Sequence, residues 1–249
     1  MKTAMFKVWR GDKEGGDFQT FEVELEPGYV VLDAIHKIQA ENASDLACRW
    51  NCKAGKCGSC SAEINGSPRL LCMTRVDDLP QGEPITVEPM RAFPVLKDLV
   101  TDVSWNYEVK ASIQPVTPRA PDFPDGSWKM EQYDVERPQE FRKCIECFLC
   151  QDVCHVLRDH QMHDRFGGPR HLIFAAQAEM NPIDTGDRIA HLREDLGIGY
   201  CNITKCCTKV CPEHIQITDN AIIPLKERLV DRSYDPIAKL IGMVTGGGR

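Results

Sequence analysis

The sequence predicts an α+β fold, with a sheet-forming first part and a mainly helical second part. Alternation of apolar and polar residues, typical of strands, dominates the first part, whereas apolar residues at helical spacing dominate the second. In addition, eleven of the 13 cysteines fall into short, regular spacings that occur in both parts. Metal-binding loops are therefore expected between the secondary-structure elements.

Four strands and one helix are expected in the first part. The strands are predicted from alternating or apolar runs bounded by turn residues, at 6–9, 18–25, 61–64 and 85–87. A glycine-rich loop at 11–17 joins the first two strands, and an Asn65-Gly66 turn follows the third. Residues 31–40 have helical spacing. Strand–strand–helix–strands is the order of a small β-grasp domain.

The second part follows a segment with four prolines and little periodicity at 112–125, which predicts an extended linker. Helices are expected beyond it at 153–160, 170–180, 188–196 and 221–230. The predicted domains are thus a β-grasp domain over residues 1–105 and an all-helical domain over residues 106–249, with the cysteine loops lying between helices.

Composition excludes several classes of protein. A net charge of −7 argues against a nucleic-acid partner, because general nucleic-acid binders are basic. The first seven residues alternate charged and apolar side chains, unlike a signal peptide. We therefore expect the chain to stay in the cytoplasm, where thiols remain free to bind metal. No run approaches the roughly 18 consecutive apolar residues of a membrane-spanning helix, so none is expected in this chain.

The first cysteine motif is Cys52-x4-Cys57-x2-Cys60, closed by Cys72. This spacing is the plant-type ferredoxin arrangement, in which four thiolates hold a [2Fe–2S] cluster. A structural zinc site is the alternative, but zinc sites usually combine two separate pairs of closely spaced cysteines. Cys48 has no place in the motif and is expected to be a small buried apolar residue.

Two further cysteine motifs share the same spacing. They are Cys144-x2-Cys147-x2-Cys150-x3-Cys154 and Cys201-x2-Thr204-x2-Cys207-x3-Cys211-Pro212, in which threonine occupies one cysteine position. In bacterial two-cluster ferredoxins the fourth cysteine of each run binds the other cluster. Exchange of the fourth cysteines assigns a [4Fe–4S] cluster to Cys144, Cys147, Cys150 and Cys211.

The remaining set is one thiolate short. Cys154, Cys201 and Cys207 lack a fourth partner because Thr204 stands in its position, and three thiolates suit a [3Fe–4S] cluster. The alternative is that Cys206 supplies the fourth ligand of a second [4Fe–4S] cluster. Because Cys206 adjoins Cys207 in sequence, its side chain is expected to point away from the loop interior.

Together these motifs resemble the iron–sulfur subunit of succinate dehydrogenase and fumarate reductase, and the resemblance covers nearly the whole chain. The segments that carry it are Cys52-Lys53-Ala54-Gly55-Lys56-Cys57-Gly58-Ser59-Cys60 with Cys72, Cys144-Ile145-Glu146-Cys147-Phe148-Leu149-Cys150, and Cys207-Thr208-Lys209-Val210-Cys211-Pro212. The resemblance implies a plant-type ferredoxin domain followed by a bacterial two-cluster ferredoxin-like domain.

The resemblance also implies a function in electron transfer. A partner flavoprotein subunit would oxidise succinate at its FAD, and electrons would pass through the [2Fe–2S], [4Fe–4S] and [3Fe–4S] clusters to menaquinone or ubiquinone beside integral-membrane anchor subunits. This is the succinate:quinone oxidoreductase of the tricarboxylic acid cycle and respiratory chain, with the chain peripheral on the cytoplasmic face of the membrane. No catalytic residue is expected in the chain itself. The alternatives are a fumarate reductase subunit running in reverse and a stand-alone ferredoxin.

The match is weakest at the quinone end. Many members of the family have tryptophans after the cysteine matching Cys154 and a histidine after the one matching Cys201. This chain has His155-Val156-Leu157-Arg158-Asp159 and Asn202-Ile203 there, so we expect a quinone pocket built differently or mainly by the anchor. His155 and Arg158 are expected to be solvated or packing residues, and His160, His163 and His171 to be surface residues rather than ligands.

Overall fold

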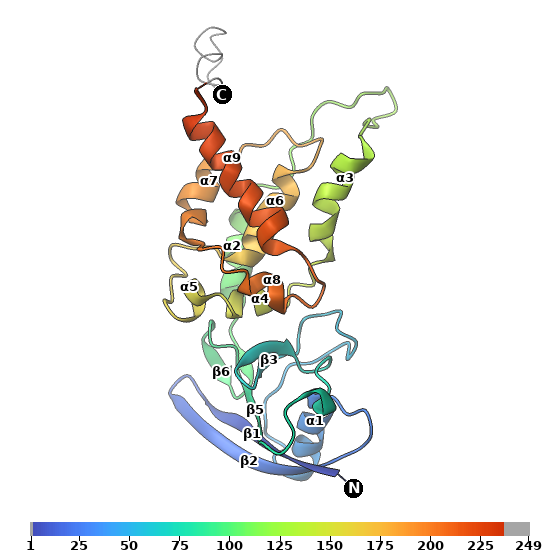
Figure 1. The fold of residues 1–249 in the computed structure, drawn as a ribbon, viewed down its shortest axis with the longest axis vertical. Helices are drawn as coiled ribbons and strands as arrows, with labels where there is room; N and C mark the ends of the chain where they lie inside the picture. The colour runs from blue at the N-terminus through green and yellow to red at the C-terminus, as the bar shows by residue number, and fades with distance from the viewer. Residues whose placement is uncertain (1, 237–249) are drawn as a thin grey trace.

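The computed structural model describes residues 2–236, and its N-terminal part forms one curved sheet beside a helix (Figure 1). Among these residues seven strands join in the order β4-β3-β5-β1-β6-β7, with β2 paired to β1. The strands are β1 (Lys2–Asp12), β2 (Gly15–Leu25), β3 (Ser61–Ile64), β4 (Ser67–Leu70), β5 (Ile85–Glu88), β6 (Val95–Lys97) and β7 (Val100–Thr101). Strand β1 is antiparallel to β2 and parallel to β5.

The sheet packs against one amphipathic helix, α1 (Val31–Glu41). Successive strand residues face opposite sides of a sheet, so Phe6 and Val8 of β1 fall on the same face. Both are fully buried in one core with Val31, Ile35 and the other buried apolar residues of α1. The α1 residues recur every three or four positions, which places them on one side of the helix.

The predicted strands and helix of this part are confirmed, with different limits. Strands β1 and β2 continue to Asp12 and Gly15, which pair with each other, so the loop predicted at 11–17 shrinks to a two-residue turn. Strand β4 was not predicted because Pro68 weakens any strand signal, and it is tolerated there at the edge of the sheet. Strands β6 and β7 are too short to carry a pattern.

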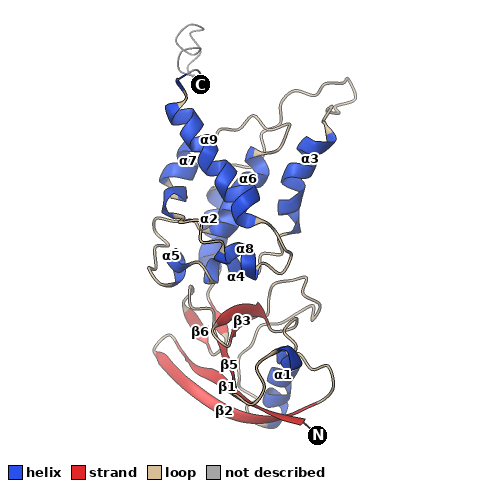
Figure 2. Ribbon diagram, viewed as in Figure 1, coloured by secondary structure: helices blue, strands red, loops and turns tan. Residues whose placement is uncertain are grey.

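The second part is helical and lies beyond the sheet along the long axis of the molecule (Figure 2). Its α-helices are α2 (Ser104–Ser112), α3 (Gln132–Gln139), α4 (Leu149–Asp152), α5 (His155–Arg158), α6 (Pro169–Glu179), α7 (Ile189–Glu194), α8 (Cys206–Val210) and α9 (Ile223–Tyr234). Shorter turns of 3-10 helix are η1 (Val76–Asp78), η2 (Glu140–Lys143) and η3 (Ile198–Tyr200), and η4 (Ile217–Ile222) is π-helical.

Three predicted helices correspond to α6, α7 and α9, and the helix predicted at 153–160 shortens to α5. A separate short helix, α4, ends just before this range, and the chain is extended at Cys154 (φ −73°, ψ 111°) between the two. Helices α2 and α3 were not predicted because each buries only one residue, so neither shows an apolar face.

The proline-rich segment after α2 is held against the helical part by a buried arginine. The Arg188 side chain is 1% exposed and donates to the backbone oxygens of Gln114 and Pro115, both at 2.6 Å. It also pairs with Asp184 at 2.7 Å, and Asp184 accepts from the Thr117 backbone N–H at 2.7 Å. This ion pair therefore anchors the segment at several points.

A second buried network joins the two parts. Glu63 of β3 is fully buried and accepts from Arg158 of α5 at 2.8 Å, while Arg91 lies 3.2 Å away. Burial raises the pKa of Glu63 to about 7, with nearby Asp152 acting in the same direction and both arginines opposing it. Burial likewise raises the pKa of Asp152 to about 6. No helix in the part of the chain that the structure describes has the length and apolar character needed to span a membrane.

Candidate iron–sulfur cluster sites

Three cysteines of the first set, Cys52, Cys57 and Cys60, lie in the loop between α1 and β3, and Cys72 follows β4. The loop before β3 curls through residues in the left-handed region. Lys53, Gly55 and Gly58 have φ of 56°, 67° and 67°. This conformation turns backbone N–H groups inward, and those of Ala54 and Lys56 donate to Cys52 Sγ at 3.4 and 3.3 Å. Such hydrogen bonds stabilise a thiolate, the form that binds metal.

The thiols of this set differ in acidity. Burial raises the pKa of Cys57, but hydrogen bonds from Ser59 and Cys52 outweigh it and bring the value to about 6. Burial dominates at Cys60, where it raises the pKa to about 12, although the Cys72 backbone N–H donates to its Sγ at 3.5 Å. The set therefore combines a readily ionised thiol with one that ionises only beside a cation.

The second set surrounds a small cavity in the helical part. Its thiols come from the η2–α4 region and from the end of α8, and they are Cys144, Cys147, Cys150 and Cys211. Burial raises the pKa of Cys147 to about 12, that of Cys150 well above its ordinary value, and that of Cys211. Buried thiols of this kind ionise when metal takes the place of their protons, so this donor set fits an iron–sulfur cluster.

The third set surrounds another small cavity and includes Cys154, Cys201 and Cys207. Burial raises the pKa of Cys154 to about 12 and that of Cys207 to about 11. Thr204 lines the same cavity, at the position where the repeat would place a fourth cysteine. Among residues 2–236, no group of three or more His, Cys, Asp or Glu side chains is arranged to hold a single metal ion.

Cys206 does not point away from this cavity, although its position next to Cys207 in the sequence led us to expect that it would. Its Sγ lies 3.2 Å from Thr204 Oγ1, and it lines the cavity with Cys207. Ile203 and Lys205 have φ of 58° and 61°, so the chain turns tightly just before α8 and presents both adjacent cysteines. Local sequence could not indicate this turn, because neither residue favours positive φ.

The first cysteine set is in direct contact with the second, and the second with the third. A Cβ atom built on Gly58 would lie 2.7 Å from Cys147 Cα, so the first and second cysteine loops are packed backbone to backbone. Ser61 Oγ lies 2.9 Å from Gly58 O and 2.8 Å from Cys147 O, so its hydroxyl bridges the two loops. Helices α4 and α8, which carry Cys150 and Cys207, pack together just beyond the sheet (Figure 1).

The remaining predicted residues have packing roles or pair with one another. Arg158 binds Glu63, as a packing residue would. His155 Nε2 and Asn202 Nδ2 are 3.1 Å apart beside the third cavity. His171 was expected at the surface but is 1% exposed, with its ring nitrogens 2.5 Å from Gly167 O and 2.8 Å from Asn106 O. Cys48 packs partly buried against the first core, and burial raises its pKa to about 12.

Sequence reasoning missed a buried cation beside the second cavity. Arg170 lines the second cavity and donates to Glu146 Oε1 at 2.7 Å, and Lys110 Nζ also pairs with Glu146. Burial raises the pKa of Glu146, but the hydrogen bonds and charges of Lys110 and Arg170 outweigh it and lower the value. A lone arginine after Pro169 belongs to no motif, so nothing in the sequence pointed to this position.

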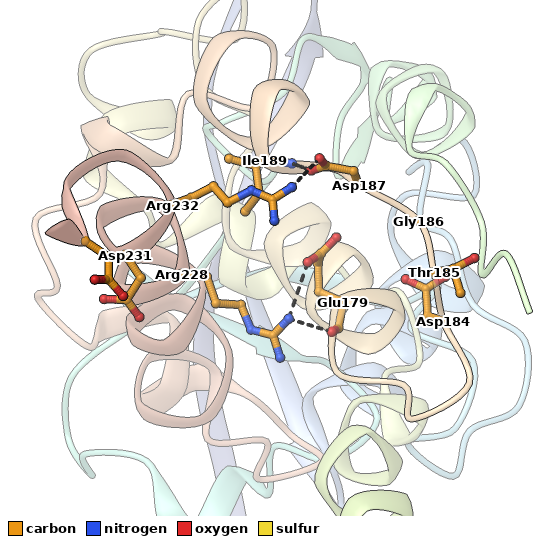
Figure 3. A pocket seen from close by; sticks show the side chains of 10 residues that line it. Glu179, Asp184, Thr185, Gly186, Asp187, Ile189, Arg228, Asp231 and Arg232 are labelled. Carbon is orange, nitrogen blue, oxygen red and sulfur yellow. Dashed lines mark hydrogen bonds and ion pairs between the residues drawn. The ribbon is translucent and has the colours of Figure 1, made fainter. Parts of the chain in front are cut away.

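A separate groove of about 780 Å³ lies between α6, α7 and α9 (Figure 3). Its two arginines are engaged in ion pairs, Arg228 with Glu179 at 3.4 Å and Arg232 with Asp187 at 2.6 Å. No cysteine of the described residues lines it, so the groove is distinct from the three sets.

Comparison with known proteins agrees with both halves of this architecture. The family of 2Fe-2S iron-sulfur cluster binding domains matches residues 5–108, and the family of 4Fe-4S dicluster domains matches residues 140–215. The fumarate reductase iron-sulfur subunit of Mycobacterium tuberculosis is 33% identical over 202 residues, which are 80% of this chain and 80% of that protein. The succinate dehydrogenase iron-sulfur subunit of Paracoccus denitrificans is 30% identical over 91% of this chain and 88% of its own length.

A solved structure is more similar still. A chain of the Mycobacterium smegmatis Sdh1 complex in the apo form is 59% identical, with a TM-score of 0.90 over 94% of this chain and 98% of that chain. The predicted fold class, a [2Fe–2S] β-grasp domain followed by a helical two-cluster domain, is confirmed. The chain therefore belongs to the family of succinate dehydrogenase and fumarate reductase iron–sulfur subunits, and it is an electron-transfer subunit of such a complex.

Proposed function

We propose that the chain relays single electrons from the FAD of a partner flavoprotein subunit to a membrane quinone, as part of a succinate:quinone oxidoreductase. One observation carries the proposal: each cysteine set lies against the next. The first set contacts the second through Gly58 and Cys147, and the second contacts the third through α4 and α8. Electron transfer requires clusters that lie next to one another, whereas sites with a purely structural role could lie apart.

The proposed ligand sets follow the cysteine spacing and, for the second and third sets, the cavities. We assign the [2Fe–2S] cluster to Cys52, Cys57, Cys60 and Cys72, the [4Fe–4S] cluster to Cys144, Cys147, Cys150 and Cys211, and the [3Fe–4S] cluster to Cys154, Cys201 and Cys207. The clusters supply one-electron chemistry when bound. The protein holds the thiolates, donates N–H groups to sulfur and excludes water from the two cavities.

The location of the chain in a complex is part of the same proposal. We infer domains over residues 1–105 and 106–249, with the [2Fe–2S] end facing the flavoprotein and the [3Fe–4S] end facing integral-membrane anchor subunits. The chain would then be peripheral on the cytoplasmic face of the membrane and serve the tricarboxylic acid cycle and the respiratory chain. The similarity to a chain of the Sdh1 complex supports the inference that the chain works within a complex.

The direction of electron transfer is tested on the purified complex. Succinate-dependent reduction of ubiquinone or menaquinone that greatly exceeds quinol-dependent fumarate reduction supports the proposed direction, and the opposite ratio supports a fumarate reductase. Both kinds of enzyme occur among the similar proteins. A tagged chain that purifies alone with all clusters in place would instead indicate a stand-alone ferredoxin.

Cluster content and ligand exchange are tested together. The intact complex should contain about nine irons per chain in three EPR-distinct clusters. If the fourth cysteines are exchanged as proposed, Cys211→Ser should alter the [4Fe–4S] signal and Cys154→Ser the [3Fe–4S] signal. The control is Cys48→Ser, which should alter neither. Reversed effects of the first two variants would show that each run holds its own cluster.

The alternative of a second [4Fe–4S] cluster is favoured by one observation: Cys206 lines the third cavity, and its Sγ lies 3.2 Å from Thr204 Oγ1. Under the proposed assignment, Cys206→Ser leaves the oxidised three-iron EPR signal and the iron content unchanged. If Cys206 is a ligand, wild-type protein lacks this signal and contains about ten irons. In that case the substitution would remove one iron and make a three-iron signal appear.

A further inference from the structure

The wall of the second cavity contains a buried cation that the cysteine motif does not explain. Arg170 is 5% exposed, lies in the first turn of α6 and lines the cavity formed by Cys144, Cys147, Cys150 and Cys211. Arginine is rarely buried unless its charge and its N–H groups find partners. Its partners therefore indicate what the cavity is built to hold.

The partners of Arg170 are incomplete. Its Nη2 donates to Glu146 Oε1 at 2.7 Å, and its guanidinium carbon lies 5.5 Å from the centre of the Phe174 ring. Its Nε is buried and has no hydrogen-bond partner among residues 2–236. A buried charged donor without an acceptor is strongly unfavourable. An acceptor inside the adjoining cavity would satisfy it.

The local charge has the sign that an anionic group requires. Arg170 and Lys110 share the single carboxylate of Glu146, which leaves positive charge in excess beside the cavity. The other charged residue lining the cavity, Glu213, is paired with Lys56 at 3.0 Å. A thiolate-bound cluster is anionic and becomes more so on reduction, so nearby positive charge and N–H donation to sulfur favour the reduced state.

We propose that Arg170 donates its free Nε–H to a sulfur of the second cluster and, together with its charge, raises the reduction potential of that cluster. The proposal rests on the proposed function, in which the four cysteines around the cavity hold a [4Fe–4S] cluster. Arg170 would contact the cluster through this hydrogen bond and would not be one of its ligands. A higher potential at this site eases the entry of electrons from the first cluster.

The test is an EPR-monitored redox titration of the whole complex for wild type, Arg170→Gln, Arg170→Lys and Lys110→Gln. Arg170→Gln should lower the potential of the [4Fe–4S] cluster, and Arg170→Lys, which keeps the charge but not the guanidinium, should lower it less. Lys110→Gln is the matched control, because it removes a cation from the same carboxylate without changing a residue that lines the cavity. The other two clusters should keep their potentials in all variants.

A second measurement uses wild-type protein, so it does not depend on folding of a variant. In protein labelled with 15N-arginine, electron spin-echo spectroscopy should detect a coupling between one arginine nitrogen and the reduced [4Fe–4S] cluster. Absence of this coupling, an unchanged potential in Arg170→Gln, or an equal shift in Lys110→Gln would overturn the role of Arg170 while the cluster itself is intact. Absence of a four-iron cluster from the wild-type complex would overturn the proposed function as well.

Discussion

Replacement of Gly58 tests whether contact between the first two cysteine loops is required. Gly58 has φ +67°, and a Cβ at this position would lie 2.7 Å from Cys147 Cα and 2.9 Å from its backbone nitrogen. Carbon atoms in contact normally lie about 3.5–4.0 Å apart. In Gly58→Ala the two loops must therefore separate by about 1 Å, because the obstacle is backbone and cannot rotate away.

The cost has two parts that a control separates. Left-handed backbone costs an alanine about 1–2 kcal/mol, and overpacking adds about 1–3 kcal/mol. Gly66 has nearly the same φ, +71°, but no atom lies within 4 Å of its built Cβ. Gly66→Ala should therefore show only the first cost, and Gly58→Ala both.

Thermal unfolding of the purified complexes at one scan rate measures the difference. About 1–3 kcal/mol corresponds to a midpoint about 2–12 °C lower for Gly58→Ala than for Gly66→Ala in a protein of this size. Because the loops carry Cys57 and Cys147, electron transfer from the first cluster to the second should also slow only in Gly58→Ala. Equal midpoints and equal transfer rates for the two variants would refute the packing argument.

Three other substitutions give defined outcomes. Thr204→Cys should convert the three-iron cluster to a four-iron cluster of lower potential, and an unchanged oxidised three-iron EPR signal would contradict the assignment. Arg188→Met leaves buried Asp184 without its cation and should lower the free energy of unfolding by about 3–5 kcal/mol, which thermal unfolding measures. The control is Arg232→Met, which removes an exposed ion pair and should cost about 1 kcal/mol or less. The raised pKa of Glu63, about 7, means that the folded protein retains a proton that the unfolded chain releases at lower pH. The stability contributed by Glu63 is therefore fully present below its unfolded pKa and is lost as pH rises to about 7, so Glu63→Gln should flatten the dependence of the unfolding midpoint on pH between about 5 and 8. An unaltered slope would contradict burial of this proton.

Prediction from sequence worked where the signal is local. The three cysteine sets could be proposed from sequence because a cluster requires ligands at short, fixed spacings, which are visible in one chain. The β1, β2 and α1 patterns were found because alternating and helical periodicity reflects burial of one face. Helix α3 and strand β4 were missed because neither has such a face, one being polar and the other containing Pro68.

Prediction failed where a residue acquires its role from distant segments. The inward position of Cys206 depends on the left-handed turn at Lys205, which the fold imposes. His171 was expected at the surface, but its burial comes from packing against the Asn106 region, 65 positions away. Nothing local distinguishes a residue of this kind from an exposed one.

Sequence by itself determined the nature of the metal chemistry and the order of the two domains, because ligand spacing and periodicity are properties of neighbouring residues. Tertiary structure alone decided how the sites face one another. The contact of Gly58 with Cys147, the pairing of Glu63 with Arg158 across 95 positions, and the placement of Arg170 beside the second cavity all arise from packing between separate segments. Packing follows from the shape of the whole chain, which no short window of sequence contains.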